Sequence, residues 1–542
     1  MAILFNFILL LSGSPAILLG SIILERFLIN SLYPLKKEVF LLMAKEEFFN
    51  RMRESGIALT FDDVRLKTGY AEVMPDHVSL ATRFSKNISL KIPIVSAAMD
   101  TVTENKMAIE LAKLGGIGII HKNLTPEEQA WEISKVKFHL NGLIEKPICV
   151  YENERIEEIL KMRNKKGFGF HSFPVLDKNG KLSGILTEND FDFCENNKLV
   201  AKDIMTKDVI TASNSTSLEE AYKIMNKEKK KVLPLIYDNG TVAGLYVFSD
   251  VKRIKTGSSS NYNIDKNGQL RVGAAIGVGK DALIRIERLL EKNIDVVVID
   301  TAHGDSRLVI QILKEIKKKY PQLDVVVGNV SEPHSIKRLI EAGADGIKVG
   351  QGGGAICTTR IIAGIGCPQV TAIYNCAKVA EKFDVPICAD GGLRYSGDIT
   401  IAIGAGANTV MLGSMLAGTK EAPGDIVFWN GRQWKNYRGM GSIGALEKNK
   451  GSRERYNQAL TGKKELIPEG IEGLVPYRGE LKDVVFQYVG GLKRGMGYVG
   501  AGNIDELRQK ADFIQLSYAG KTESHPHDVE IIKEAPNYYI EK

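Results

Sequence analysis

The sequence has few cysteines and no arrangement that would pair them. Among 542 residues there are six, which form neither a CxxC motif nor a regular framework: Cys149, Cys194, Cys357, Cys367, Cys376 and Cys388. This pattern excludes a disulfide framework and predicts reduced thiols in the cytoplasm. At most one or two of the thiols are expected to be chemically special.

A concentrated positive charge is also missing. The formal net charge of +7 is small for this length, and the basic residues are dispersed along the chain. A nucleic-acid partner is therefore not expected. Hydrophobic residues make up 44% and charged residues 25% of the chain, which excludes wholesale disorder and a polytopic membrane protein.

Long uncharged runs are confined to the start of the chain. No charged residue occurs from Ile3 to Leu24, a stretch long enough to cross a bilayer, although Asn6 and Pro15 weaken it. Two interpretations stay open for residues 1–42. They are either an extension upstream of a true translation start at Met43 or a membrane segment. The first interpretation keeps the protein in the cytoplasm, and the second attaches it to a membrane.

Eight short apolar runs dominate the rest of the chain. Each has the length of a buried parallel strand, and most precede an amphipathic stretch; they cover residues 93–99, 115–121, 270–277, 296–303, 325–330, 346–352, 386–392 and 409–414. Glycine, histidine, aspartate or serine follows at the strand exits. Together with 53 glycines, this rhythm predicts an α/β enzyme built as a (β/α)₈ TIM barrel, with a doubly wound sheet as the alternative.

The rhythm breaks between the second and third strands, over residues 146–256. This insert contains an internal repeat, because Phe173-Pro174-Val175-Leu176 and Leu233-Pro234-Leu235-Ile236 correspond at an offset of sixty residues. An Asn-Gly turn follows each run and predicts a hairpin. The two halves, 146–200 and 201–256, resemble tandem CBS domains (a Bateman module), which in other proteins often bind adenine or guanine nucleotides. A spacer that binds nothing is the alternative.

The glycine-rich loop after the sixth strand carries the strongest local signal. It runs from Gly350 to Arg360 and places Cys357 beside two hydroxyl groups and an arginine. A thiol near a cation ionises more readily, and the thiolate is a nucleophile. The sequence therefore predicts a reactive Cys357, while Cys149, Cys367, Cys376 and Cys388 are expected to be inert.

The loops after strands seven and eight are suited to a phosphate. Barrel enzymes often bind phosphate there on outward-pointing backbone amides. In this chain those loops are Asp390-Gly391-Gly392 and Gly413-Ser414. Asp390 is suited to accept hydrogen bonds from ribose hydroxyl groups.

These motifs, taken in order, resemble the IMP dehydrogenase and GMP reductase family over almost everything from about residue 55 to the end. The matching stretches are residues 59–64, 94–104, 115–123, 350–360, 389–392, 437–442, 468–473 and 523–528. The resemblance implies a first barrel part over 43–145, the inserted CBS pair, and the rest of the barrel over 257–542. It also implies a mobile flap over about 430–473 and a cation-binding segment near the C-terminus.

The activity implied is the NAD-dependent oxidation of IMP to XMP, the committed step of guanine nucleotide synthesis. In the family the cysteine adds to C2 of the purine, and hydride passes to NAD⁺. The flap then replaces the reduced cofactor, and water hydrolyses the adduct. The resemblance assigns water activation to Arg455 and Tyr456, with Thr359 and Glu469 as a second relay. Arginine is an unusual base, because its pKa above ~12 normally keeps it protonated.

The resemblance also implies the ligand contacts. IMP is expected at Asp390, Gly391, Gly392, Gly413, Ser414, Tyr437, Met440, Gly441 and Glu469, and NAD at Asp300, Asn329, Gly350 and Gly352. No GxGxxG follows a first strand, so barrel loops rather than a Rossmann unit would hold NAD. Potassium is expected on the backbone of Gly352, Gly354 and Cys357 together with Glu523, Ser524 and His525 of a neighbouring subunit. That arrangement requires an oligomer, usually a homotetramer.

Three positions depart from the family pattern. Gly353 and Ala355 replace a proline and a serine, and the serine would donate to the IMP phosphate; weaker IMP binding is therefore expected. Asp305 stands where histidine is usual. Two other functions stay open: a GMP reductase, which commonly lacks the flap and the insert, and a nucleotide sensor with an inactive barrel. A transition metal at His525 and His527 is a further alternative to potassium.

Overall fold

The computed structural model describes residues 43–139, 143–144, 147–165, 172–255, 261–279, 281–456, 458, 461–462 and 465–538. The predictions for residues 1–42 lie outside these ranges, as do the expected insert boundaries at 146 and 256. In the described part of the chain, no helix is both long enough and apolar enough to span a bilayer.

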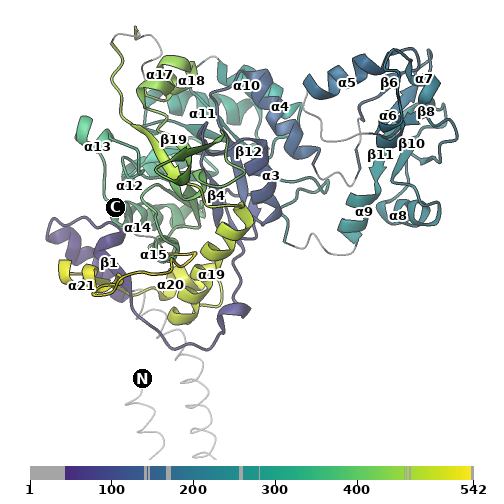
Figure 1. Cartoon of the computed structure of the whole chain (residues 1–542). Coiled ribbons are helices and arrows are strands. Elements are labelled where there is room, and N and C mark those ends of the chain that lie inside the picture. The colour runs from purple at the N-terminus through teal and green to yellow at the C-terminus, as the bar shows by residue number, and fades with distance from the viewer. Residues whose placement is uncertain are drawn as a thin grey trace, which may run out of the picture.

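A closed barrel of eight parallel strands forms the centre of the molecule (Figure 1). Its strands are β4 (Ile94–Ser96), β5 (Ile117–Ile120), β12 (Val272–Ile276), β13 (Val296–Asp300), β14 (Asp324–Val330), β15 (Gly346–Val349), β16 (Ile387–Asp390) and β17 (Thr409–Leu412). Each coincides with one of the eight apolar runs, β14 beginning one residue earlier than its run, so the predicted (β/α)₈ barrel is confirmed. The doubly wound alternative is wrong because β17 pairs with β4 and closes the sheet.

Helices cover the outside of the barrel. They are α3 (Asn105–Lys113), α4 (Pro126–Lys137), α10 (Asp281–Leu290), α11 (Arg307–Lys319), α12 (Pro333–Glu341), α14 (Gln369–Ala380) and α15 (Ser396–Gly404), and α19 (Leu481–Val499) packs between α15 and α3. Strand periodicity divides the core. Val296 and Val298 of β13 point into the barrel, whereas Val297 and Ile299 face the helices.

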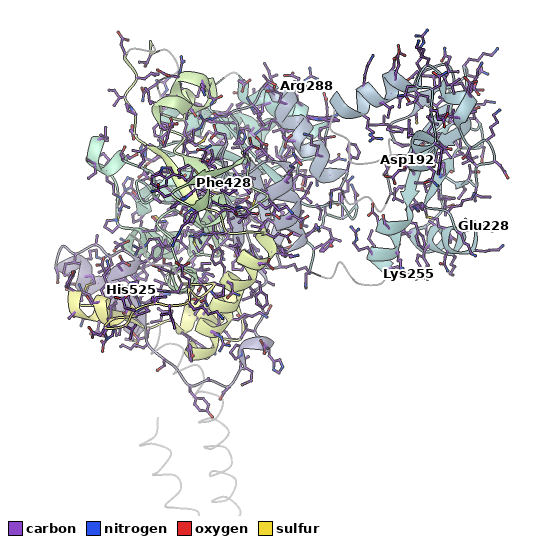
Figure 2. All side chains as sticks on the ribbon, viewed as in Figure 1. Asp192, Glu228, Lys255, Arg288, Phe428 and His525 are labelled. Atoms are coloured by element: carbon purple, nitrogen blue, oxygen red, sulfur yellow. The ribbon has the colours of Figure 1, made fainter. Side chains whose placement is uncertain are left out.

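The insert forms two small units beside the barrel. The first comprises β6 (Val150–Tyr151), α5 (Ile156–Lys165), β7 (Phe173–Leu176), β8 (Leu182–Leu186), α6 (Glu188–Asp192) and α7 (Ala201–Ile204). The second comprises β9 (Ala212–Ser213), α8 (Leu218–Lys227), β10 (Val232–Ile236), β11 (Val242–Val247) and α9 (Phe248–Lys255). Figure 2 shows this body, with Asp192, Glu228 and Lys255 labelled, projecting from one side of the barrel.

The internal repeat extends to backbone detail. Each unit has one three-stranded sheet, and its hairpin turns at a glycine of positive φ, Gly180 or Gly240. The hairpin register shifts after Val175 in the first unit and after Leu235 in the second, again sixty residues apart. The sequence repeat is therefore a structural repeat of one hairpin unit.

The chain after β17 forms a layer over the barrel mouth. It contains α16 (Ser414–Ala417), β18 (Ile426–Trp429), β19 (Arg432–Arg438), α17 (Ile443–Lys448), α18 (Lys450–Arg455) and β20 (Glu472–Pro476). The remaining elements are the helix over 43–54, η1 (Phe61–Asp63), β1 (Val64–Leu66), η2 (Pro75–His77), β2 (Thr82–Arg83), β3 (Ser89–Leu90), α13 (Thr359–Ile362), η3 (Glu381–Phe383), α20 (Ile504–Lys510), β21 (Phe513–Gln515) and α21 (Tyr518–Glu523).

Candidate active site

One pocket lies at the carboxyl ends of the barrel strands and collects nearly every predicted site residue. Its lining includes Cys357, Thr359, Arg455, Tyr456, Asp300, Asn329, Gly350, Gly352, Gly354, Asp390, Gly391, Gly392, Gly413, Ser414, Tyr437, Met440 and Glu469. Gly441 is not part of the lining. Its carbonyl oxygen accepts from the Glu469 amide at 3.0 Å, and a side chain at Gly441 would meet the Tyr456 ring. Gly441 therefore packs behind the pocket wall.

The cysteine loop is held in a tight turn. The Cys357 amide donates to the Gly354 carbonyl at 3.0 Å, and the Cys357 Sγ lies 3.1 Å from the Thr359 hydroxyl oxygen. Gly350 has a φ of +144°, and a Cβ there would lie 2.0 Å from the Asp390 carbonyl oxygen. Only glycine allows this approach, so the loop brings the thiol and Asp390 into one pocket.

Backbone hydrogen bonds tie the cysteine loop to the layer over the barrel mouth. The Thr358 amide donates to the Glu469 carbonyl at 2.9 Å, and the Ile471 amide donates to the Ile356 carbonyl at 3.0 Å. Segments more than one hundred residues apart thus form a short two-stranded contact around Cys357. This contact places Glu469 in the pocket with the thiol.

Lys348 joins two of the predicted carboxylates and was not identified in the sequence analysis. It lies in the middle of β15 with 2% of its surface exposed, and its Nζ is 2.9 Å from Asp300 Oδ1 and 2.5 Å from Asp390 Oδ2. A lysine inside an apolar strand was the available signal, because a buried charge needs a partner. Lys348 therefore joins the two aspartates through one ammonium group.

Asn329 joins the polar group formed by Lys348, Asp300 and Asp390. Its Nδ2 donates to the Gly350 carbonyl at 2.5 Å and to Asp390 Oδ2 at 3.0 Å. Its Oδ1 is buried and has no hydrogen-bond partner among the described residues. An acceptor left open in a pocket wall is suited to receive a donor from a ligand.

The Arg455-Tyr456 pair enters the pocket from the end of α18. Arg455 forms an ion pair with Asp300, and its carbonyl oxygen accepts from the Ala302 amide at 3.0 Å. Burial raises the pKa of Tyr456, and the neighbouring arginine opposes that shift. Both residues line the pocket, and Arg455 contacts Asp300 there, so the pair is not an exposed surface pair.

Tyr437 stands beside the predicted phosphate loop. A Cβ on Gly413 would lie 2.8 Å from the tyrosine hydroxyl oxygen, and burial raises the pKa of Tyr437 well above its ordinary value. The hydroxyl group therefore keeps its proton at neutral pH and can donate to an anion. Ala355 lies across the same pocket and is exposed.

The four cysteines predicted to be inert have disfavoured thiolates. Burial raises the pKa of Cys149 to about 11, of Cys367 to about 11 and of Cys388 to about 12, and it raises the pKa of Cys376 further. These thiols stay protonated at neutral pH. None of the four lines the pocket.

Asp305 has a structural explanation that the sequence did not supply. Its side chain is buried after β13 and accepts a hydrogen bond from the Ser335 hydroxyl at 2.8 Å, with Arg338 Nη1 3.4 Å from the other oxygen. Ser335 and Arg338 lie in α12. Asp305 therefore ties the loop after one strand to the helix after the next.

The C-terminal segment lies away from the pocket. The ammonium group of Lys521 is 2.7 Å from Asp62 Oδ2, and the His525 Nδ1 is 3.1 Å from the Tyr538 hydroxyl. Within the described chain, no hydrogen bond or ion pair joins Glu523, Ser524 or His525 to the cysteine loop. Figure 2 shows His525 beneath the barrel, beside the short helix α21.

The fold and site define a class of protein: a (β/α)₈ barrel enzyme with a pocket at the carboxyl ends of its strands, lined by Cys357 and by glycine-rich loops. The family model for the IMP dehydrogenase / GMP reductase domain matches residues 58–527, and the chain belongs to this family. It is 50% identical to inosine-5′-monophosphate dehydrogenase from Aquifex aeolicus, over 89% of this chain and 98% of that protein. The dehydrogenase from Helicobacter pylori is 49% identical over 89% of this chain and 98% of its own length.

A solved structure gives a similar match. A GMP reductase from Trypanosoma brucei, in complex with guanosine 5′-monophosphate, superposes with a TM-score of 0.81 at 40% identity, covering 87% of this chain and 98% of that one. The match extends over more of this chain than the barrel segments alone.

Proposed function

We propose that this protein oxidises IMP to XMP with NAD⁺ as the hydride acceptor. The observation that carries the proposal is the meeting of Cys357 with Arg455 and Tyr456 in one pocket. The first residue is suited to form a covalent adduct, and the other two are suited to its hydrolysis. Relatives near 50% identity over most of the chain, which bear the name of the dehydrogenase, support the same activity.

IMP would lie between the cysteine loop and the loops after β16 and β17. Asp390 would accept from the ribose hydroxyl groups, while Lys348 and Asn329 hold its carboxylate in place. The backbone of Gly391, Gly392, Gly413 and Ser414 would bind the phosphate, together with the Tyr437 hydroxyl. Glu469 and the backbone near Met440 would face the purine.

In the first step the Cys357 thiolate would form a bond to C2 of the purine while the C2–N3 double bond opens and places its electron pair on N3. As that double bond re-forms, the hydrogen at C2 would leave as hydride with its electron pair, and NAD⁺ would supply the acceptor. Asp300, Asn329, Gly350 and Gly352 would hold that cofactor, and the open acceptor at Asn329 Oδ1 fits a donor group on it. In the second step water adds to C2, the C–S bond breaks, and XMP leaves as the thiolate is restored.

Asp300 explains why the two steps would follow one another. The same carboxylate is the expected cofactor acceptor and the partner of Arg455 in this structure. Arg455 therefore takes its place beside Asp300 only when the cofactor does not use that side chain. The flap would move in after NADH leaves, and Arg455 with Tyr456, or Thr359 with Glu469, would accept the proton of the attacking water.

Potassium and a second subunit complete the proposed site. The carbonyl oxygens of Gly352 and Cys357 accept no hydrogen bond from the described residues, so they are free to bind a cation. Glu523, Ser524 and His525 would come from a neighbouring chain in a homotetramer. The insert would take purine nucleotides, with Thr187 beside Asp190 in the first unit and Val247 in the matching place of the second.

The proposal is tested by mixing purified protein with IMP, NAD⁺ and potassium and following the absorbance of NADH. A parallel assay offers GMP and NADPH, because the GMP reductase match makes that activity the second candidate. NADH formation from IMP supports the dehydrogenase. Activity only in the assay with GMP and NADPH would establish the reductase. No activity in either assay would favour a nucleotide sensor with an inactive barrel.

Ala355→Ser is expected to tighten IMP binding. Position 355 lines the pocket and is exposed to it, so a serine hydroxyl there can donate to the phosphate. A charge-assisted hydrogen bond of this kind corresponds to roughly tenfold or more in the dissociation constant. Calorimetric titration with IMP measures the change. Ala355→Gly serves as the control, and equal affinities in both variants would refute the prediction.

Lys122 is expected to make stability depend on pH above neutrality. It is fully buried, and burial followed by repulsion from Arg455 lowers its pKa to about 7. The unfolded state holds the lysine proton up to its ordinary pKa near ~10.4, so stability increases as pH rises between these values. Lys122→Met should raise the Tm at pH 7, and this gain should shrink by pH 9.5. A gain independent of pH would contradict the prediction.

A further inference from the structure

The loop after β5 makes direct contact with the helix that carries Arg455. Asn123 Nδ2 lies 3.1 Å from the Ser452 hydroxyl oxygen, and that hydroxyl lies 3.2 Å from Asn123 Oδ1. Ser452 is completely buried and stands three residues before Arg455 in α18. Because residues three apart share one face of a helix, this contact bears on where the arginine points.

The approach of the two segments is unusually close. A Cβ on Gly451 would lie 2.8 Å from the Lys122 carbonyl oxygen and 3.0 Å from Asn123 Oδ1. A larger residue at 451 would push α18 away from the barrel. The helix therefore sits directly on the strand exit, with only a glycine between them.

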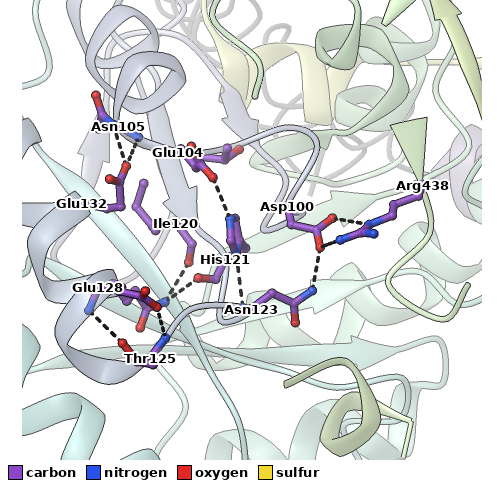
Figure 3. A network of polar contacts seen from close by, with 12 residues as sticks. Asp100, Glu104, Asn105, Ile120, His121, Asn123, Thr125, Glu128, Glu132 and Arg438 are labelled. Carbon is purple, nitrogen blue, oxygen red and sulfur yellow. Dashed lines mark hydrogen bonds and ion pairs between the residues drawn. The ribbon is translucent and has the colours of Figure 1, made fainter. Parts of the chain in front are cut away.

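Asn123 is itself held by the barrel. Its side-chain Nδ2 donates to Asp100 Oδ2 at 2.8 Å, and its backbone amide donates to His121 Nδ1 at 3.2 Å (Figure 3). His121 is 2% exposed, and its Nε2 lies 3.5 Å from Glu104 Oε1. These barrel contacts orient the Asn123 side chain independently of α18.

Asp100 connects the same network to a second part of the layer over the pocket. Its carboxylate receives Arg438 Nε at 3.1 Å and Nη2 at 2.6 Å, and Arg438 ends strand β19 (Figure 3). Asp100 therefore holds β19, while the neighbouring Asn123 holds α18. The two docking points share one hydrogen bond and lie on the exits of adjacent strands, β4 and β5.

We propose that Asn123 is a positioning residue that docks α18 and so sets Arg455 against Asp300 for hydrolysis. This inference rests on the proposed function. The barrel contacts of Asn123 do not depend on the flap, but its contact with Ser452 exists only while α18 is seated. Loss of the Asn123 side-chain amide would leave the buried Ser452 hydroxyl without a hydrogen-bond partner only in the state in which α18 packs on the loop after β5.

The expected effect is on the second step. Asn123→Ala should slow hydrolysis roughly tenfold to hundredfold, the range that corresponds to one unsatisfied buried polar group. Hydride transfer should continue, because Asn123 does not line the pocket. A rapid burst of one NADH per site, followed by slow turnover, is therefore expected. The apparent affinity for NAD⁺ should be unchanged or higher, since Arg455 competes less for Asp300.

Stopped-flow measurement of NADH resolves the burst from the steady state. Thr125→Ala is the matched control: it removes the N-terminal cap of α4 two residues away and touches no part of α18. Ser452→Ala and the double variant that combines Asn123→Ala with Ser452→Ala complete a double-mutant cycle. The double variant should hydrolyse faster than Asn123→Ala, because it leaves no unsatisfied hydroxyl group.

Each outcome decides the inference. The inference is supported if Asn123→Ala keeps the NADH burst but hydrolyses slowly, and if the double variant hydrolyses faster than Asn123→Ala. Thr125→Ala should show normal kinetics. Unchanged hydrolysis in Asn123→Ala, or a burst lost together with hydrolysis, overturns the docking role while leaving the dehydrogenase in place. Wild-type protein that makes no NADH from IMP overturns the proposed function and the docking role with it.

Discussion

Replacing Cys357 with alanine is expected to abolish NADH formation from IMP and to leave IMP binding largely intact. The thiolate would form the only covalent bond to the substrate, and removal of a nucleophile typically costs ~10⁴-fold or more in turnover. The ribose and phosphate contacts proposed above come from other loops of the pocket, through Asp390 and Ser414. NADH absorbance and calorimetric titration with IMP measure the two effects.

Cys367→Ala is the matched control for this variant. Cys367 follows the same loop, but burial raises its pKa to about 11, it does not line the pocket, and its carbonyl oxygen accepts from Arg360 Nη2 at 2.6 Å. Its substitution should leave turnover close to wild type. NADH formation at a normal rate by Cys357→Ala would show that hydride transfer needs no adduct, and the proposed chemistry would be wrong.

The barrel could be predicted because its strands are buried on both faces. Such strands are continuous apolar runs, and Val296 to Ile299 illustrate this, since alternate side chains enter the barrel core and the helix interface. The insert could be predicted from its repeat. Contacts within one hairpin turn, such as that at Gly180, depend on neighbouring residues only.

The contacts that unite the site could not be predicted in this way. Lys348 on β15 meets Asp300 from β13 and Asp390 from β16 because the closed barrel brings the side chains of these strands together in its interior, and no local sequence pattern records that neighbourhood. The docking of Ser452 on Asn123 joins residues 329 positions apart. Such pairs depend on the whole topology, whereas Cys357 could be found because its own loop carries the signal.

Replacing Arg455 with alanine is expected to block hydrolysis selectively. The residue lies against Asp300 beside the partly buried Tyr456, where we propose that it takes a proton from water, and loss of a general base typically costs ~10²- to 10⁴-fold. Hydride transfer precedes this step and should survive. The variant should therefore release a burst of one NADH per site and accumulate the covalent adduct, which mass spectrometry of rapidly quenched protein detects at Cys357.

Arg453 provides the comparison on the same helix. Its guanidinium donates to the carbonyl oxygens of Leu446 and Glu447 within the flap, and it does not line the pocket. Arg453→Ala should alter hydrolysis far less than Arg455→Ala. A burst lost together with hydrolysis in Arg455→Ala would place this arginine in hydride transfer or substrate binding. Unchanged hydrolysis would leave Thr359 and Glu469 as the relay, because they are the remaining proton acceptors proposed beside the thiol.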